Sequence, residues 1–201
     1  MTVPLDRVLG RIPGAVFEAQ YREHGDPWDF AHSPYEQRRY RLTVAMLPRH
    51  RYRRAFEPGC SVGELTAHLA PRCDAVLAME CSPTAVGRAR QRCADLPNVQ
   101  ILEGEVPAAW PDGTFDLVVL SELGYYFAPA ELSCLVARSA RALEPGGTLV
   151  AVHWRGHSPD HVLGGDEVHT VARDVAAAEE LALDAVYGEA KFRADVWSRA
   201  A

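Results

Sequence analysis

The segment Glu57-Pro58-Gly59-Cys60-Ser61-Val62-Gly63 decides the fold. It follows a short strand predicted over residues 54–57 and precedes a helix predicted over residues 64–70, which stops before Pro71. Glycines in such a turn let the backbone bend tightly and let a ligand approach the bare main chain. The N-terminus of the following helix adds aligned N–H groups that attract a carboxylate or a phosphate. The segment therefore predicts a ligand-binding loop in an α/β sheet.

Strands and helices alternate on the C-terminal side of this loop. Further strands are predicted over residues 75–80, 99–102, 115–120 and 148–153, and helices over residues 83–95 and 129–143. Ser82-Pro83 supplies an N-cap and a first-turn proline for one of these helices. The continuous apolar run that starts at Phe115 is typical of a strand buried on both faces. This alternation predicts a parallel, doubly wound, Rossmann-like sheet.

Both ends of the chain depart from this alternation. Ser33-Pro34-Tyr35-Glu36 forms a capping box and predicts a helix over residues 34–47, after about 30 irregular residues with one short helix. Near the C-terminus, a helix over residues 166–178 precedes two strands, residues 181–186 and 191–197, whose short connection makes them an antiparallel hairpin. We expect an α/β fold with a seven-stranded sheet and an antiparallel C-terminal hairpin.

Length and composition favour one globular domain. The chain has 201 residues, with 21 basic and 27 acidic side chains and a net charge of −6. We expect a single domain over residues 1–201, in which residues 1–53 form a helical lid or substrate segment and residues 54–201 form the cofactor-binding core. The acidic balance argues against a nucleic-acid partner. No apolar run reaches the ~18 residues of a membrane span, and no signal-peptide core is present, so we expect a cytoplasmic protein.

The cysteines and histidines do not predict a metal site. Five cysteines are present without a Cys-x-x-Cys pair, so neither a disulfide framework nor a thiolate zinc site is favoured. His153, His157, His161 and His169 lie close in sequence, but their spacing fits no ligand pattern, and we interpret the stretch as a loop over the substrate. Seven arginines between residues 38 and 54 indicate a solvated basic face rather than a site for an anionic substrate.

The acidic residue that ends the second strand indicates the class of cofactor. Glu80 lies about 20 residues after the loop, where a carboxylate can accept hydrogen bonds from both hydroxyls of a ribose. The dinucleotide fingerprint would need glycines at the positions of Ser61 and Glu64, so it fails. Glu57, two residues before the first glycine, suits a cofactor with a cationic amine. S-adenosyl-L-methionine (SAM) carries such an amine.

Five motifs occur in the order seen in class I SAM-dependent methyltransferases. They are Glu57-x-Gly59-x-x-x-Gly63, Glu80, Gly104-Glu105-Val106, Phe115-Asp116-Leu117-Val118 and Leu143-x-Pro145-Gly146-Gly147. The chain resembles this class over residues 54–155. Further segments resemble the nodulation protein S (NodS) family: residues 26–30, 33–36, 58–63, 70–74, 121–126 and 165–169. That broader resemblance covers most of the chain. It implies transfer of a methyl group from SAM to the amine of an amino sugar or a deacetylated chitooligosaccharide, with S-adenosyl-L-homocysteine (SAH) as the other product.

The resemblance also implies roles for individual residues. The residues expected to contact the cofactor are Tyr35, Arg39, Glu57, Gly59, Cys60, Ser61, Gly63, Glu80, Cys81, Glu105, Val106 and Ser121. The glycine loop with Glu57 would hold the methionine part, and Glu80 the ribose. Glu105 and Val106 would meet the adenine, and Ser121 would lie beside the sulfonium. Tyr35 and Arg39 could close over the cofactor carboxylate. Two positions depart from the commoner pattern, because Ser61 replaces the central glycine and Glu105 an aspartate.

Three residues are candidates for moving the acceptor's proton. An amine must be neutral to attack the methyl group, and a carboxylate or an imidazole can take its proton. Glu122, His153 and His169 follow the fourth and fifth strands. We hypothesise that His153 is the best placed, since ligands of open α/β sheets bind at the carboxyl ends of strands.

Other functions fit parts of the sequence. Oxygen methylation of a sugar or a natural product is the nearest alternative. In either case we expect the partner to be a small, sugar-like substrate and the enzyme to be a monomer or a homodimer. A serine hydrolase is more remote: residues 59–63 match Gly-x-Ser-x-Gly, and Ser61, Asp116 and His169 occur in the required order. Too few residues precede Ser61 for that fold, and Glu80 would have no task. A protein that binds the cofactor without chemistry is the third alternative.

Overall fold

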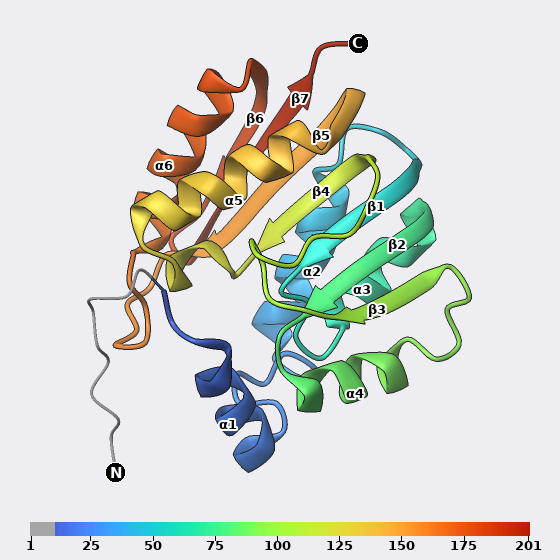
Figure 1. Cartoon of the computed structure of the whole chain (residues 1–201), viewed down its shortest axis with the longest axis vertical. Helices are drawn as coiled ribbons and strands as arrows, with labels where there is room; N and C mark the ends of the chain where they lie inside the picture. The colour runs from blue at the N-terminus through green and yellow to red at the C-terminus, as the bar shows by residue number, and fades with distance from the viewer. Residues whose placement is uncertain (1–10) are drawn as a thin grey trace.

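A seven-stranded mixed sheet forms the centre of the computed structural model, which describes residues 11–201 (Figure 1). The strands are β1 (Tyr52–Pro58), β2 (Cys73–Glu80), β3 (Val99–Glu103), β4 (Phe115–Ser121), β5 (Leu143–Trp154), β6 (Leu181–Gly188) and β7 (Phe192–Arg199). Their order across the sheet is β3-β2-β1-β4-β5-β7-β6. The first five strands are parallel, whereas β7 is antiparallel to both β5 and β6. The predicted fold class, with its antiparallel C-terminal strands, is confirmed.

Helices cover both faces of this sheet. They are α1 (Gly14–His24), α2 (Pro34–Ala45), α3 (Glu64–Leu69), α4 (Pro83–Arg92), α5 (Pro129–Arg141) and α6 (Gly165–Ala178), with short 3-10 turns η1 (Ala70–Arg72) and η2 (Gly124–Tyr126). Helices α5 and α6 pack on one face, and α2, α3 and α4 on the other (Figure 1). Helix α1 lies near the end of the sheet where β2 and β4 point, in contact with α4 (Figure 1).

Successive residues of the central strands pack into the hydrophobic cores on opposite faces of the sheet. In β1, Phe56 packs with the α5–α6 layer, while its neighbour Ala55 packs with the α2–α3 layer. In β4, Val118 and Leu117 divide in the same way. Because side chains alternate across a strand, a sheet covered on both faces requires continuous apolar runs. The parallel register brings the carboxyl ends of β1, β2, β3 and β4 to one edge, where the site lies.

Some element boundaries differ from the predicted ones for local reasons. Strand β5 begins at Leu143 rather than at residue 148, because Leu143 already pairs with Phe115 ahead of a register irregularity. Strand β1 begins at Tyr52 rather than at residue 54. The carboxylate of Asp116 accepts hydrogen bonds from the backbone N–H groups of Arg53 and Arg54, both at 2.8 Å, and so fixes the start of that strand. The turn η2 had no predicted counterpart.

Most of the arginines between residues 38 and 54 face acidic side chains brought by the fold. The pairs are Arg38–Glu189, Arg39–Glu36, Arg49–Asp116, Arg51–Asp74 and Arg53–Glu144. The Arg39–Glu36 pair is buried, whereas the arginines of the other four pairs are exposed, and exposed pairs contribute little to stability. They do neutralise the segment, which supports a solvated face rather than an anion site. Within residues 11–201, no helix is long and apolar enough to cross a membrane, and no group of three or more potential metal ligands gathers.

Candidate active site

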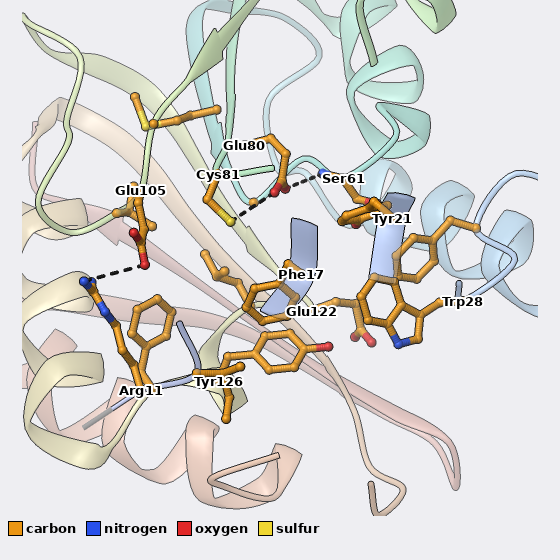
Figure 2. A pocket seen from close by; sticks show the side chains of 18 residues that line it. Arg11, Phe17, Tyr21, Trp28, Ser61, Glu80, Cys81, Glu105, Glu122 and Tyr126 are labelled. Atoms are coloured by element: carbon orange, nitrogen blue, oxygen red, sulfur yellow. Dashed lines mark hydrogen bonds and ion pairs between the residues drawn. The ribbon is translucent and has the colours of Figure 1, made fainter. Parts of the chain in front are cut away.

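A pocket opens where β1, β2 and β4 end, between these strand ends and the N-terminal segment with α1 (Figure 2). Its lining residues are Arg11, Ile12, Phe17, Tyr21, Trp28, Phe30, Gly59, Ser61, Met79, Glu80, Cys81, Gly104, Glu105, Val106, Glu122, Leu123, Tyr126 and Phe127. The empty space, including its mouth, is about 720 Å³.

The glycine loop forms one wall of the pocket in a left-handed conformation. Gly59, Ser61 and Gly63 have φ angles of 73°, 52° and 86°. A Cβ at Gly59 would lie 2.9 Å from Leu123 Cδ1, and one at Gly63 would lie 3.1 Å from Ala89 Cα. Both glycines are therefore favoured by conformation, and Gly63 is in addition packed closely against the backbone of α4. Ser61 occupies the left-handed region that glycine favours, which explains why this position is commonly glycine.

Glu80 is buried at the end of β2 and is fixed by its neighbours. Its Oε2 accepts a hydrogen bond from Ser61 N at 3.0 Å, and its Oε1 accepts from Ser82 N at 2.9 Å and from Cys81 Sγ at 3.2 Å. The carboxylate still lines the pocket (Figure 2). A fixed carboxylate here can accept further hydrogen bonds from the hydroxyls of a ribose.

A smaller pocket shares Gly59, Ser61 and Glu122 with the first and extends it toward α2. It is also lined by Glu57, Cys60 and Ser121. Burial raises the pKa of Glu57 to about 8, although a hydrogen bond of 2.6 Å donated by Thr66 Oγ1 favours the charged form. Within residues 11–201, no cationic side chain forms an ion pair with Glu57. A ligand ammonium at this place would supply the missing charge.

Glu122 and Arg39 form an ion pair beside this smaller pocket. Arg39 Nη1 lies 2.9 Å from Glu122 Oε1, and the buried guanidinium also pairs with Glu36. Glu122 Oε1 further accepts from Trp154 N at 2.7 Å, and Oε2 accepts from the Tyr125 hydroxyl at 2.6 Å. The Glu122 carboxylate is thus held rigidly in the wall of both pockets.

The opposite end of the main pocket is apolar with a polar rim. Ile12, Met79, Val106 and Phe127 line it, and Glu105 stands at its mouth, 3.6 Å from Arg11 Nη2 (Figure 2). An apolar slot with a carboxylate at its edge suits a flat ring bearing an amino group. From end to end, the donors and acceptors fit the ammonium, ribose and adenine of SAM.

Comparisons with known proteins agree with this geometry. The family model described as nodulation protein S (NodS) matches residues 18–175. This chain belongs to the NodS family. NodS of Rhizobium tropici is 29% identical over 160 residues, which are 77% of this chain and 67% of that protein. The chain thus spans about two thirds of the length of such curated relatives.

Solved structures show the same fold. A Pseudomonas syringae protein assigned as a methyltransferase is 43% identical, with a TM-score of 0.72 over 82% of this chain and 99% of that chain. NodS N-methyltransferase from Bradyrhizobium japonicum, in complex with SAH, is 22% identical, with a TM-score of 0.77 over 92% of this chain and 98% of that one. The chain is a class I SAM-dependent methyltransferase.

Two of the three candidate bases of this NodS-family enzyme do not reach the pocket. His153 and His169 are buried behind η2, and neither lines the main or the smaller pocket. His153 Nε2 accepts a hydrogen bond from Gly124 N at 3.0 Å, and burial holds the pKa of His153 well below its usual range. The hypothesis that His153 takes the acceptor's proton is therefore corrected. Of the three, only Glu122 faces the pocket.

The two residues expected to close over the cofactor carboxylate also lie differently. Tyr35 donates its hydroxyl hydrogen bond to Lys191 O at 3.3 Å and packs against Phe192, so it does not line either pocket. The structure therefore does not place Tyr35 where the expected contact with the cofactor would require it. Arg39 does line the smaller pocket, but its charge is already shared between Glu36 and Glu122.

Helix α1 supplies site residues that sequence reasoning missed. Tyr21 is buried and donates a hydrogen bond of 2.5 Å to Ser61 Oγ, and Phe17 packs edge-on against Tyr126 at 4.8 Å between ring centroids. Figure 2 shows both rings in the pocket. Their spacing of four residues, which places them on one face of a helix, was the available signal.

The serine-hydrolase alternative has no structural support. Ser61 Oγ accepts from Tyr21, Asp116 caps the start of β1, and His169 lies beside Asp195. These three residues do not meet, so no catalytic triad exists.

Proposed function

We propose that this methyltransferase modifies the amine of a small, sugar-like acceptor, most simply an amino sugar or chitooligosaccharide. The observation that carries the proposal is the wall opposite Glu80, where the Glu122 carboxylate lies with the aromatic rings of Phe17, Trp28 and Tyr126. Carboxylates and aromatic faces both attract an amine and its cation. The Bradyrhizobium japonicum relative is an N-methyltransferase by its description, which supports the same reading.

The cofactor contacts follow from the donor set. SAM would supply the electrophilic methyl group on its sulfonium. Glu57 would face the ammonium, with Gly59, Cys60 and Ser61 along the methionine part, while Gly63, which lines neither pocket, would shape the loop behind them. Glu80 and Cys81 would meet the ribose, Glu105 and Val106 the adenine, and Ser121 the region of the sulfonium, with Arg39 behind it. The protein's main contribution is then to align the acceptor and exclude water.

Glu122 is the residue we propose for the acceptor's proton. Its Oε2 receives one hydrogen bond from Tyr125 and has a further lone pair for an acceptor N–H. When the amine nitrogen forms its bond to the methyl carbon, the proton released from nitrogen would pass to this oxygen. The remaining contacts, from Arg39 and Trp154, keep the carboxylate oriented.

Residues 1–53 serve in this proposal as the lid and substrate segment of one domain over residues 1–201, of which residues 1–10 lie outside the part of the chain that the structure describes. Ile12 N donates to Tyr126 O at 2.8 Å, and Tyr21 donates to Ser61, so this segment lies across the pocket. Entry of the cofactor would require α1 to move. Oxygen methylation of a sugar is the second candidate, because a hydroxyl could occupy the same place beside Glu122.

Titration with SAH tests the cofactor site. We expect the wild type to bind SAH with micromolar affinity, and Glu80→Ala to weaken binding by about 10- to 100-fold because two hydrogen bonds to a charged group are lost. Glu80→Gln should lie between the two. Glu103→Ala is the matched control, since Glu103 pairs in register with Glu80 but is exposed and outside the pocket lining. Absence of SAH binding by the wild type would overturn the assignment.

An acceptor panel tests the proposed substrate. Glucosamine oligomers and their N-acetylated counterparts would be incubated with SAM, and the products analysed by mass spectrometry. The proposal expects methylation at nitrogen of the free amine and none of the acetylated oligomers. Equal methylation of both would favour a hydroxyl acceptor instead.

A further inference from the structure

A chain of buried polar groups runs beneath the active site and ends at the turn η2. Asp195 of β7 lies 3.2 Å from His169 Nδ1, measured to Oδ2. His169 Nε2 lies 3.3 Å from His153 Nδ1 on β5, and His153 Nε2 accepts from Gly124 N at 3.0 Å. All three side chains are buried, with exposed fractions of 1% or less. None of them lines either pocket, so the proposed methyl transfer does not itself assign them a role.

The hydrogen bonds determine where the protons of this chain reside. A backbone N–H can only donate, so His153 Nε2 must carry a lone pair toward Gly124. The imidazole proton then resides on Nδ1, which donates to His169 Nε2, and His169 Nδ1–H faces Asp195. Both histidines are thereby neutral and single-tautomer. Asp195 remains charged because Arg173 Nε and Arg193 Nε donate to it at 2.7 and 3.0 Å.

The Gly124 end of this series of buried polar groups fixes η2, the turn that carries part of the pocket wall. In η2, Tyr125 donates to Glu122, and the adjacent Tyr126 lines the pocket. Gly124 itself is tightly enclosed, since an added Cβ would clash with Val168 Cγ1 and lie 3.0 Å from His153 Nε2. The depth at which η2 sits is therefore set by His153 on one side and α6 on the other.

We infer that His153, His169 and Asp195 form a positioning relay that holds η2, and through it Glu122 and Tyr126, in the geometry needed for methyl transfer. The inference rests on the proposed function only in assigning Glu122 to the acceptor's proton. The relay residues line neither pocket and act through the residues that do. Rigidity arises because the Gly124 N–H fixes the tautomer of His153, and the tautomer of His153 in turn fixes that of His169.

The tautomer of His153 tests the relay in the unmodified protein. Long-range ¹H–¹⁵N correlation spectra distinguish a protonated Nδ1 from a protonated Nε2. The relay requires the Nδ1–H form of His153, with Nε2 unprotonated. A protonated Nε2 at neutral pH would overturn it. This result does not depend on which acceptor the enzyme uses or on whether an acceptor is found.

Two isosteric substitutions test the function of the relay. His153→Gln places Oε1 where Nε2 stood and can still accept from Gly124, whereas His153→Asn reaches only toward His169. We expect Asn to lower kcat by about 10- to 100-fold, as misplaced catalytic groups do, and Gln to restore most of it, with SAH affinity little changed in both. Equal kcat in the two variants would overturn the inference, as would a loss confined to KM. If the Asn variant does not fold, the amide chemical shift of Gly124 in the Gln variant remains as the measurement, and the relay requires it to match that of the wild type.

Discussion

Glu57 shows at the scale of one residue how a ligand-binding charge costs stability in the free protein. Burial raises its pKa from 4.5 to about 8, and the nearby negative charge of Glu80 acts in the same direction. Between these values the unfolded chain has released the proton while the folded chain still holds it. Stability must therefore fall as the pH rises from 4.5 to 8.

Glu57→Gln should remove this penalty and weaken the cofactor together. We expect the variant to be more stable than the wild type at pH 8 by on the order of 1–4 kcal/mol, and by much less at pH 5. Affinity for SAH should fall, because the ammonium loses its carboxylate. Urea unfolding at both pH values and SAH titration measure the two effects. A stability difference that is the same at pH 5 and pH 8 would contradict the account.

At the scale of the element, α1 is attached to the site by its own side chains. Glu18 accepts hydrogen bonds from Ser82 Oγ at 2.6 Å, Thr84 Oγ1 at 2.8 Å and Thr84 N at 3.1 Å, at the N-terminus of α4. These bonds lower the pKa of Glu18, and a helix N-terminus favours a carboxylate. Together with Tyr21, which donates to Ser61, they hold α1, the proposed lid, over the pocket.

Glu18→Gln should loosen this lid. We expect SAH to dissociate about 5- to 10-fold faster, with a smaller change in its association rate. Glu23→Gln on the same helix is the control, because the Glu23 side chain is exposed and bonds nothing in α4. Hydrogen exchange of residues 20–40 should slow when SAH binds the wild type and slow less in Glu18→Gln. Identical exchange with and without SAH would exclude a lid.

The elements that sequence predicts well are those whose signals are local. Gly59 and Gly63, the strand end at Glu80 and the cap at Ser33 each carry their own conformational reason, and the structure places them as expected. The burial of His153 was not predictable in this way. Its place at a strand end suggested the site, but its ring points to α6, whose position depends on contacts far along the chain. The same holds for η2, which has no periodicity and is fixed by tertiary contacts.

At the scale of the whole molecule, opposing buried groups set the pH dependence of stability. Burial lowers the pKa of His153 far below normal and that of His161 to about 4, so both stay neutral in the folded chain where the unfolded chain binds protons. Stability is therefore lost as the pH falls below about 6.5. Glu57 acts in the opposite direction up to pH 8, and Glu36, whose pKa burial also raises, acts in the same direction as Glu57.

Below pH 6.5 the two histidines change the free energy of unfolding with pH more than the carboxyl groups do. Above pH 6.5 the histidines are neutral in both the folded and the unfolded chain, so the effect of Glu57 remains. Stability of the free protein should thus be greatest near pH 6.5 and fall on both sides, by at most about 1.4 kcal/mol per pH unit for each net proton. Urea unfolding at pH 5, 6.5 and 8 measures this. Glu57→Gln should flatten the alkaline side alone, and His161→Gln should make the acid side shallower. Saturating SAH should also flatten the alkaline side, because its ammonium stabilises ionised Glu57. A wild type whose stability keeps rising to pH 8 would show that Glu57 is not neutral in the free protein.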